Sequence, residues 1–209
     1  MIAYCIRHGE SAFNAEGRIQ GQQDPPLSEH GARQARALAE TFADAAIDAI
    51  YCSPLSRARQ TAEPIAQVLG LQLQFDDRLR EIHAGIFQGM LWTEIQQQHP
   101  EEAQRWQGQE PDFVVPGGES RRDLMRRGGE VLTEVLTNGH ANAIVVSHGG
   151  LLAGAFKALL GIPAERNPFA LHNASITRVG WDGRFRLDSL NETAHLIDAG
   201  AAPRPWGSQ

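Results

Sequence analysis

Short apolar runs alternate along the chain with longer stretches in which apolar residues recur at helical spacing. The apolar runs end at polar or glycine residues, which is typical of buried strands. They lie at residues 2–6, 47–52, 71–75 and 143–147. The helical stretches lie at residues 28–42, 54–69, 120–136 and 151–160. Strands that alternate with helices in this way predict an α/β fold with a mostly parallel sheet.

Several helix boundaries are marked by capping residues. Ser28 and Ser120 each precede a helical stretch and predict N-caps, because a serine oxygen can accept a bond from a free N–H of the first turn. Ser53 followed by Pro54 predicts a third helix start, since proline fits the first helical position. Pro64 predicts a kink in that helix.

The remaining segments complete the expected architecture. Residues 175–179 and 185–190 alternate like strands around an Asp-Gly pair that predicts a hairpin turn. We therefore expect a three-layer sandwich with one antiparallel edge strand. Residues 76–118 have weak periodicity and predict a small inserted cap with one or two short helices, at 92–98 and 101–106. With no repeat or linker, residues 1–198 are expected to form one domain, followed by a disordered tail over 199–209.

Composition excludes several protein classes. The chain has 209 residues and a formal net charge of −6, which disfavours nucleic-acid and anionic membrane partners. A hydrophobic content of 42% excludes a disordered chain. No apolar run approaches the ~20 residues that cross a bilayer, and the first residues lack a signal-peptide core, so we expect a cytoplasmic protein. Cys5 and Cys52 match no metal-ligand spacing and are expected in the core. Lys157 is the only lysine, a bias that codon usage explains.

Histidine and arginine stand where the predicted strands end. His8 and His148 each follow an apolar strand and precede a glycine, Arg7 precedes His8, and Arg57 lies one turn into a following helix. Ligands of open α/β sheets bind at the carboxyl ends of strands. Singly, each residue is more typical of a structural role, but together they predict a positive pocket suited to phosphate. A zinc site is disfavoured because no third ligand stands at an equivalent position and the arginines would repel the ion.

Five motifs in this order resemble the histidine phosphatase superfamily, the phosphoglycerate mutase-like proteins. They are Arg7-His8-Gly9-Glu10-Ser11 with Asn14, Ser53-Pro54-Leu55 with Arg57, Leu79-Arg80-Glu81, Pro116-Gly117-Gly118-Glu119-Ser120, and Ser147-His148-Gly149. The resemblance covers residues 2–198. Arg18-Ile19-Gln20-Gly21 and Asn173-Ala174-Ser175 are similar to its small phosphatase branch. The chain departs from the pattern at Gln88, where many relatives carry glutamate, so the resemblance does not fix substrate preference.

The resemblance implies a role for each site residue. His8 is the expected nucleophile, since an imidazole attacks only when neutral and nearby positive charge disfavours its protonation. Arg7, Arg57, Asn14, His148 and the Gly149 amide are the expected phosphate donors. Glu81 is the expected general acid and base, and Gln20 and Gly21 are expected substrate contacts. The roles of Glu10 and His83 stay open. No metal or cofactor is implied.

Three functions fit these residues: a phosphomonoester hydrolase, a phosphoglycerate mutase, or a non-catalytic phosphate-binding module. The last is disfavoured because every residue that the chemistry needs is present. A mutase must keep water from its phosphohistidine, which favours a large lid and an ordered tail. The segment between Glu81 and His148 is short and the tail at residues 200–205 is expected to be loose, so we expect a metal-independent hydrolase of a small phosphorylated metabolite. The sequence leaves the substrate and the oligomeric state open.

Overall fold

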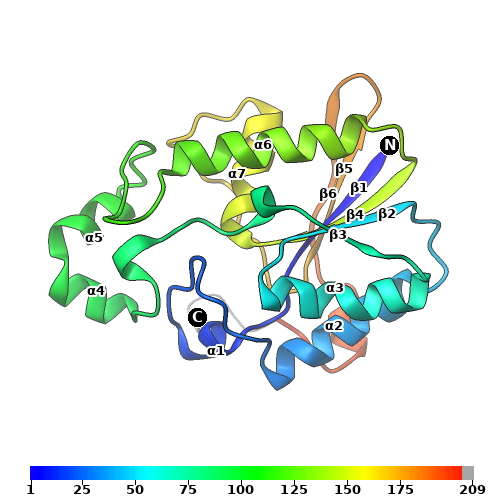
Figure 1. Ribbon diagram of the computed structural model, residues 1–209, viewed down its shortest axis with the longest axis horizontal. Helices are drawn as coiled ribbons and strands as arrows, with labels where there is room; N and C mark the ends of the chain where they lie inside the picture. The colour runs from blue at the N-terminus through cyan, green and yellow to red at the C-terminus, as the bar shows by residue number, and fades with distance from the viewer. Residues whose placement is uncertain (204–209) are drawn as a thin grey trace.

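A six-stranded sheet runs through the middle of the protein (Figure 1). A computed structural model describes residues 1–203. The strands lie in the order β3-β2-β4-β1-β5-β6. Their bounds are β1 Ile2–Arg7, β2 Ala49–Cys52, β3 Leu73–Phe75, β4 Asn142–Ser147, β5 Ile176–Trp181 and β6 Phe185–Glu192. Pairing is parallel from β3 to β1 and antiparallel on both sides of β5. The predicted mostly parallel sheet with antiparallel pairing at one edge is confirmed.

Helices cover both faces of this sheet (Figure 1). On one face lie α6 (Arg121–Thr137) and α7 (Gly149–Leu160), and on the other lie α2 (Glu29–Phe42) and α3 (Ser56–Leu69). Leu132 and Phe156 are buried on the first face, and Leu38 and Ile65 on the second. Each such side chain contributes roughly 1.5–3 kcal/mol through burial. The predicted three-layer sandwich is therefore confirmed.

Two of the three predicted N-caps are confirmed. Ser28 Oγ accepts a hydrogen bond from Gly31 N at 3.0 Å, and Ser120 Oγ accepts one from Asp123 N at 3.0 Å.

The prediction that Ser53 caps α3 is wrong, because that helix begins at Ser56. Asp24, from the loop before α2, accepts bonds from Ser56 N at 2.6 Å and Ser56 Oγ at 2.7 Å. Ser53 is left free to contact another strand end. Pro64 lies inside α3, and the kink there stays a prediction.

The segment expected to form a cap has a small core of its own. Short 3-10 helices at Asp77–Leu79 and Gly85–Phe87 lead into α4 (Trp92–Gln98) and α5 (Pro100–Gln107), which lie beyond the end of the sheet (Figure 1). Both predicted short helices are confirmed. Phe87 is fully buried, and Trp92 and Trp106 meet its ring edge-on at centroid distances of 6.5 and 5.8 Å. This cluster holds α4 and α5 together.

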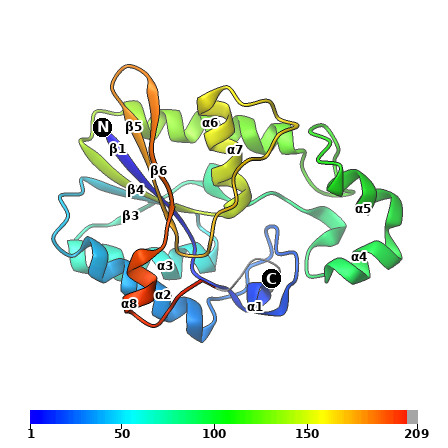
Figure 2. The same ribbon diagram turned by 180° about the vertical axis from the view of Figure 1, so that it is seen from behind.

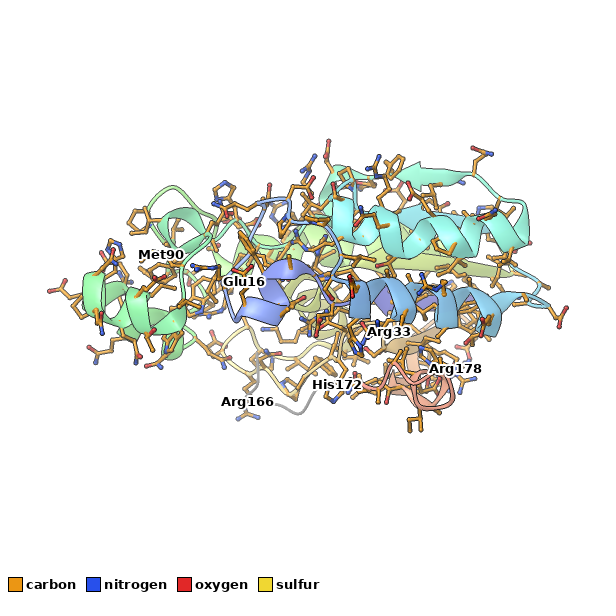
Figure 3. All side chains as sticks on the ribbon, turned by 90° about the horizontal axis from the view of Figure 1, so that it is seen from below. Glu16, Arg33, Met90, Arg166, His172 and Arg178 are labelled. Atoms are coloured by element: carbon orange, nitrogen blue, oxygen red, sulfur yellow. The ribbon has the colours of Figure 1, made fainter. Side chains whose placement is uncertain are left out.

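The cap segment is joined to the loop that follows α1 (Ala12–Glu16). Ile19 N donates to Met90 O at 2.9 Å, and Gly89 N donates to Ile19 O at 2.7 Å. Figure 3 labels Met90 on the cap side of this junction and Glu16 at the end of α1. Helical periodicity did not predict α1, since five residues are too few to establish a repeat.

The chain returns to α2 after the sheet ends. Helix α8 (Ala194–Asp198) lies beside α2 (Figure 2). Ala201 is fully buried and its carbonyl accepts a bond from Gln34 Nε2 at 3.3 Å. The carbonyls of Ala201 and Ala202 thus contact α2, and the disordered tail expected over 199–209 stays a prediction. Residues 204–209 lie outside the described part. None of the described helices is long and apolar enough to cross a membrane.

Candidate active site

Strand register brings the two histidines together. Because β1 and β4 pair in parallel with Arg7 opposite Ser147, the next residues on both strands, His8 and His148, leave the sheet side by side. The two rings lie 5.1 Å apart between centroids. On the far side of β4, Ser53 follows β2, and its Oγ lies 2.8 Å from His148 Nε2. The convergence predicted from the strand ends is therefore observed.

The tautomer of His8 follows from its hydrogen bonds. His8 Nδ1 lies 2.6 Å from Gly9 O, and a carbonyl oxygen can only accept, so Nδ1 carries the proton. The other nitrogen, Nε2, then carries the lone pair. Arg57 Nε donates to Nε2 at 3.3 Å. The His8 side chain is 2% exposed, so its surroundings fix the direction in which Nε2 points.

Burial and positive charge keep both histidines neutral. The pKa of His8 lies well below its ordinary value, through burial first and then through the charges of Arg57 and Arg7. The pKa of His148 is lowered in the same way, by burial and by Arg57. At neutral pH His8 therefore has the unprotonated Nε2 that a nucleophile needs.

Arg57 and Arg7 supply positive charge beside His8 without forming an ion pair with a carboxylate in the described part of the chain. Within residues 1–203 neither arginine takes part in a salt bridge, and backbone carbonyls of Gly21 and Gln23 hold the Arg57 guanidinium at 2.8 Å each. Arg7 NH1 donates to Leu171 O, and its buried Nε has no partner within the described part. Burial lowers the pKa of each arginine to about 10, so both stay charged at neutral pH. Such a pair favours an anionic ligand.

The expected substrate contacts fall into two groups. Asn14 and Gln20 are buried, and their amide oxygens are occupied: Asn14 Oδ1 accepts from Asn173 Nδ2 at 3.1 Å, and Gln20 Oε1 accepts from Ser11 Oγ at 2.7 Å. The side-chain amide nitrogens of Asn14 and Gln20 therefore remain available to donate to a ligand. Gly21, by contrast, faces Arg57 with its carbonyl, and its position there supports the arginine.

Glu81 lies at the start of α7. Its Oε2 accepts from Gly150 N at 3.0 Å, and its Oε1 accepts from Leu151 N at 3.1 Å and from Ile82 N at 2.9 Å. The amino end of a helix attracts negative charge. The sequence led us to expect that the Gly149 amide, at the positive end of α7, binds phosphate. The next two amides, of Gly150 and Leu151, bind the Glu81 carboxylate instead.

Three residues near the site were not predicted. Arg127 on α6 donates to the carbonyls of Arg80 at 2.6 Å and Glu81 at 2.9 Å and pairs with Glu119 at 2.6 Å, which fixes the Glu81 segment. Asn173 Nδ2 donates to His8 O at 3.0 Å. Ser53 is the third, through its contact with His148. Periodicity gives no signal for such contacts, because each joins segments far apart in the chain.

The sequence left the roles of Glu10 and His83 open, and in the structure Glu10 contacts the start of α2 while His83 contacts the backbone of the cap segment. Glu10 is 1% exposed and its Oε1 accepts from Ser28 Oγ at 2.7 Å, so it lies against the start of α2. His83 Nδ1 accepts from Gly85 N at 3.2 Å within the cap segment. Neither residue lines the cavity beside Arg7 and Glu81 that is described next.

A cavity of about 480 Å³ opens beside Arg7 and Glu81. It extends along α7 toward the cap helix α5 and the connection between α7 and β5, on which Figure 3 labels Arg166 and His172. Cavities of this size take small organic ligands. In the described part of the chain, no three His, Cys, Asp or Glu side chains gather in a way that suits a metal ion.

Comparison with known proteins finds one family. The family model of the histidine phosphatase superfamily (branch 1) matches residues 3–193. Phosphoserine phosphatase 1 of Hydrogenobacter thermophilus is 37% identical over 195 residues, which covers 91% of this chain and 92% of that protein. A Yersinia pestis protein named "Probable phosphoglycerate mutase GpmB" is also 37% identical, over 205 residues, covering 92% of this chain and 94% of its own length.

Solved structures agree with this family. A mycobacterial glucosyl-3-phosphoglycerate phosphatase superposes with a TM-score of 0.83 at 33% identity and covers 92% of this chain and 99% of its own. YhfR of Bacillus stearothermophilus superposes with a TM-score of 0.86 at 30% identity, covering 93% and 98%. These relatives are similar along nearly the whole chain, through the cap segment as well as the sheet.

Proposed function

We propose, from the premise that this chain is an enzyme and belongs to the histidine phosphatase superfamily, that it hydrolyses phosphomonoesters through a phosphohistidine on His8. The observation that carries the proposal is the state of His8. Its Nδ1 is occupied by Gly9 O at 2.6 Å, and its Nε2 lone pair lies against Arg57. A neutral nucleophile held beside two cations that form no salt bridge within residues 1–203 suits attack on a phosphate dianion.

In the first step, His8 Nε2 attacks phosphorus and the bond to the leaving oxygen breaks, with its electron pair staying on that oxygen. Glu81 gives this oxygen a proton. Arg7, Arg57, Asn14 and His148 donate to the phosphoryl oxygens as charge redistributes in the transition state. The proton on His8 Nδ1 stays on that nitrogen and keeps its hydrogen bond to Gly9 O, which favours the cationic phosphoimidazole.

In the second step, water attacks phosphorus and the P–N bond breaks, with its electron pair returning to Nε2. Glu81, now a carboxylate, accepts the proton that water loses. Protons balance over the two steps, because Glu81 returns to its starting form. Neither step needs a metal or a cofactor, and the substrate is a small phosphorylated metabolite, as the names of the relatives suggest.

A His8→Ala variant tests this mechanism. Wild-type enzyme quenched during turnover of a labelled substrate should carry phosphate that is labile in acid and stable in base, and the folded variant should carry none and lose turnover. His140→Ala, which precedes β4 at the opposite end of the sheet, is the control and should behave as wild type. Wild-type turnover by folded His8→Ala would rule the mechanism out.

A phosphoglycerate mutase is the second candidate, because a relative of equal identity carries that name. The contact of the Ala201 carbonyl with Gln34 of α2 also weakens the loose tail as an argument against a mutase. The two activities are separated by supplying 3-phosphoglycerate with and without a bisphosphoglycerate primer. Release of inorganic phosphate supports the hydrolase, and isomerisation that depends on the primer supports the mutase.

A further inference from the structure

Two cations outside the proposed phosphate site line the cavity that opens beside Arg7 and Glu81. Arg121 is the first residue of α6, and Lys157, the only lysine in the chain, lies on α7. The Lys157 ammonium donates to Ala164 O at 3.0 Å, and the Arg121 guanidinium donates to Trp106 O at 2.9 Å and stacks 4.3 Å from the centre of that ring. Within residues 1–203 neither cation has a salt-bridge partner.

Their placement is unfavourable for the protein alone. Lys157 is only 5% exposed and forms no salt bridge within residues 1–203, and burying a cation in this way is costly even with the charge of Glu165 nearby. Arg121 stands at the amino end of α6, where the helix dipole disfavours positive charge. Burial lowers the pKa of Arg121, and burial together with the charge of Arg121 lowers the pKa of Lys157. Both side chains line one cavity, so an anionic ligand group in it would offset the repulsion between the two cations.

Helix α7 connects these cations to the reacting centre. Gly149, Gly150, Ala153, Gly154 and Lys157 line the cavity along one side of this helix. The first four have at most a methyl side chain, so they leave room along the helix for a ligand. At 1.5 Å per residue, the seven steps from Gly150 to Lys157 span about 10 Å, and helical side chains lean back toward the amino end. Because Glu81 binds Gly150 N, the acid that protonates the leaving group lies at one end of this path and the cations at the other.

We propose that Arg121 and Lys157 bind a second anionic group on the organic part of the phosphomonoester, so that the enzyme selects extended substrates with a charged far end. The inference deepens the proposed function, since it assigns the cavity to the leaving group. The charged residues that line the cavity are three cations and one carboxylate, Arg7, Arg121, Lys157 and Glu81. This balance favours a substrate whose far end is anionic over one whose far end is neutral. The path of about 10 Å along α7 from Gly150 to Lys157 predicts that organic parts long enough to span it bind best.

Non-hydrolysable phosphonates test this subsite without turnover. One series ends in hydroxyl, one in carboxylate and one in a second phosphonate, each at several chain lengths, and dissociation constants are measured by calorimetry. For wild type, the anionic ends should bind about 10-fold tighter than hydroxyl at the best length, as expected for one hydrogen bond to a charged group. Whether carboxylate or phosphonate gains more identifies the anion.

Variants separate a ligand role from a structural one. Lys157→Met and Arg121→Gln should each lower the preference for anionic ends about 10-fold while leaving hydroxyl-ended phosphonates within about twofold of wild type. Lys157→Arg should retain the preference. Arg126→Gln, which removes an exposed arginine of α6 that pairs with Glu130 at 3.1 Å, is the control and should change nothing.

Two results would overturn the subsite. One is equal affinity of wild type for hydroxyl and anionic ends at every length, and the other is a loss in the variants that is the same for all three series. Failure of the proposed function looks different. In that case phosphate esters are not turned over by wild type, while the phosphonates still show a preference that depends on Arg121 and Lys157, and the subsite stands.

Discussion

Gly150 and Glu81 meet so closely that no side chain fits between them. The Gly150 N–H donates to Glu81 Oε2 at 3.0 Å, and a Cβ built on residue 150 would lie 2.5 Å from Glu81 Oε1. Glycine at this position thus allows the carboxylate to approach the backbone at the start of α7. The conformation of Glu81, and with it the position of the expected proton donor, depends on a residue that has no side chain.

A Gly150→Ala substitution should therefore displace Glu81. We expect phosphorylation of His8 by an alkyl phosphate, measured in a single turnover, to slow by about 100-fold, as a displacement of about 1 Å can cause. Gly108→Ala is the control, because a Cβ there meets only ordinary contacts, the nearest at 3.4 Å. A Gly150→Ala enzyme as fast as wild type would show that the position of Glu81 does not matter to the reaction.

Glu81→Gln should affect substrates according to their leaving groups. General acid catalysis contributes about 10²–10⁴-fold where the leaving oxygen needs a proton, so alkyl phosphates should be phosphorylated onto His8 that much more slowly. A nitrophenyl phosphate should lose far less, because nitrophenolate leaves unprotonated.

This comparison needs single-turnover kinetics, since hydrolysis of the phosphohistidine can limit steady-state rates for both esters. The exposed Glu101→Gln on α5 serves as the control for a lost carboxylate. An equal loss for alkyl and aryl esters would argue against Glu81 as the acid and make Glu10 the next carboxylate to test.

Stability should fall in acid because of the buried histidines. The pKa of His8 is lowered in the folded state, so below about pH 6.5 the unfolded chain binds a proton that the folded chain does not. The free energy of unfolding should then decrease as pH falls from 6.5 toward the folded-state pKa, by about 1.4 kcal/mol per pH unit for this residue. Denaturant titrations in phosphate-free buffer measure it.

His8→Gln removes the contribution of His8 to the difference in bound protons between the unfolded and folded states. Its free energy of unfolding should depend less steeply on pH than that of wild type in the same window, by the same amount, while at pH 8 the two slopes should agree. If the variant and wild type lose stability in parallel below pH 6.5, then His8 is not held neutral by the fold.

Activity should be unchanged after dialysis against a strong chelator. The positive charge that binds phosphate comes from Arg7 and Arg57, which remain cationic with pKa values of about 10. Phosphate release from an alkyl ester is measured before and after dialysis, with a zinc-dependent phosphatase treated alongside to show that the chelator works. Loss of activity that a divalent ion restores would refute the metal-independent mechanism.

The sequence determined most of the local structure. Apolar runs of strand length and helical repeats with serine caps at Ser28 and Ser120 placed the main elements, because these signals lie within a few neighbouring residues. The same local pattern placed His8 and His148 at strand ends. The sequence did not predict α1, since five residues give no period, nor the contact of Ala201 with α2, since a backbone contact leaves no trace in composition.

The tertiary structure alone decided how distant segments meet. Parallel pairing of β1 with β4, in a register that sets Arg7 opposite Ser147, turned two separate His-Gly pairs into neighbours, and packing of α6 brought Arg127 to the carbonyl of Glu81. The contact of Ser53 with His148 joins residues 95 positions apart, and the shared cavity of Arg121 and Lys157 depends on how α6 lies on α7. Such contacts depend on side-chain packing across the fold, which a pattern of hydrophobic and polar positions along one segment does not specify.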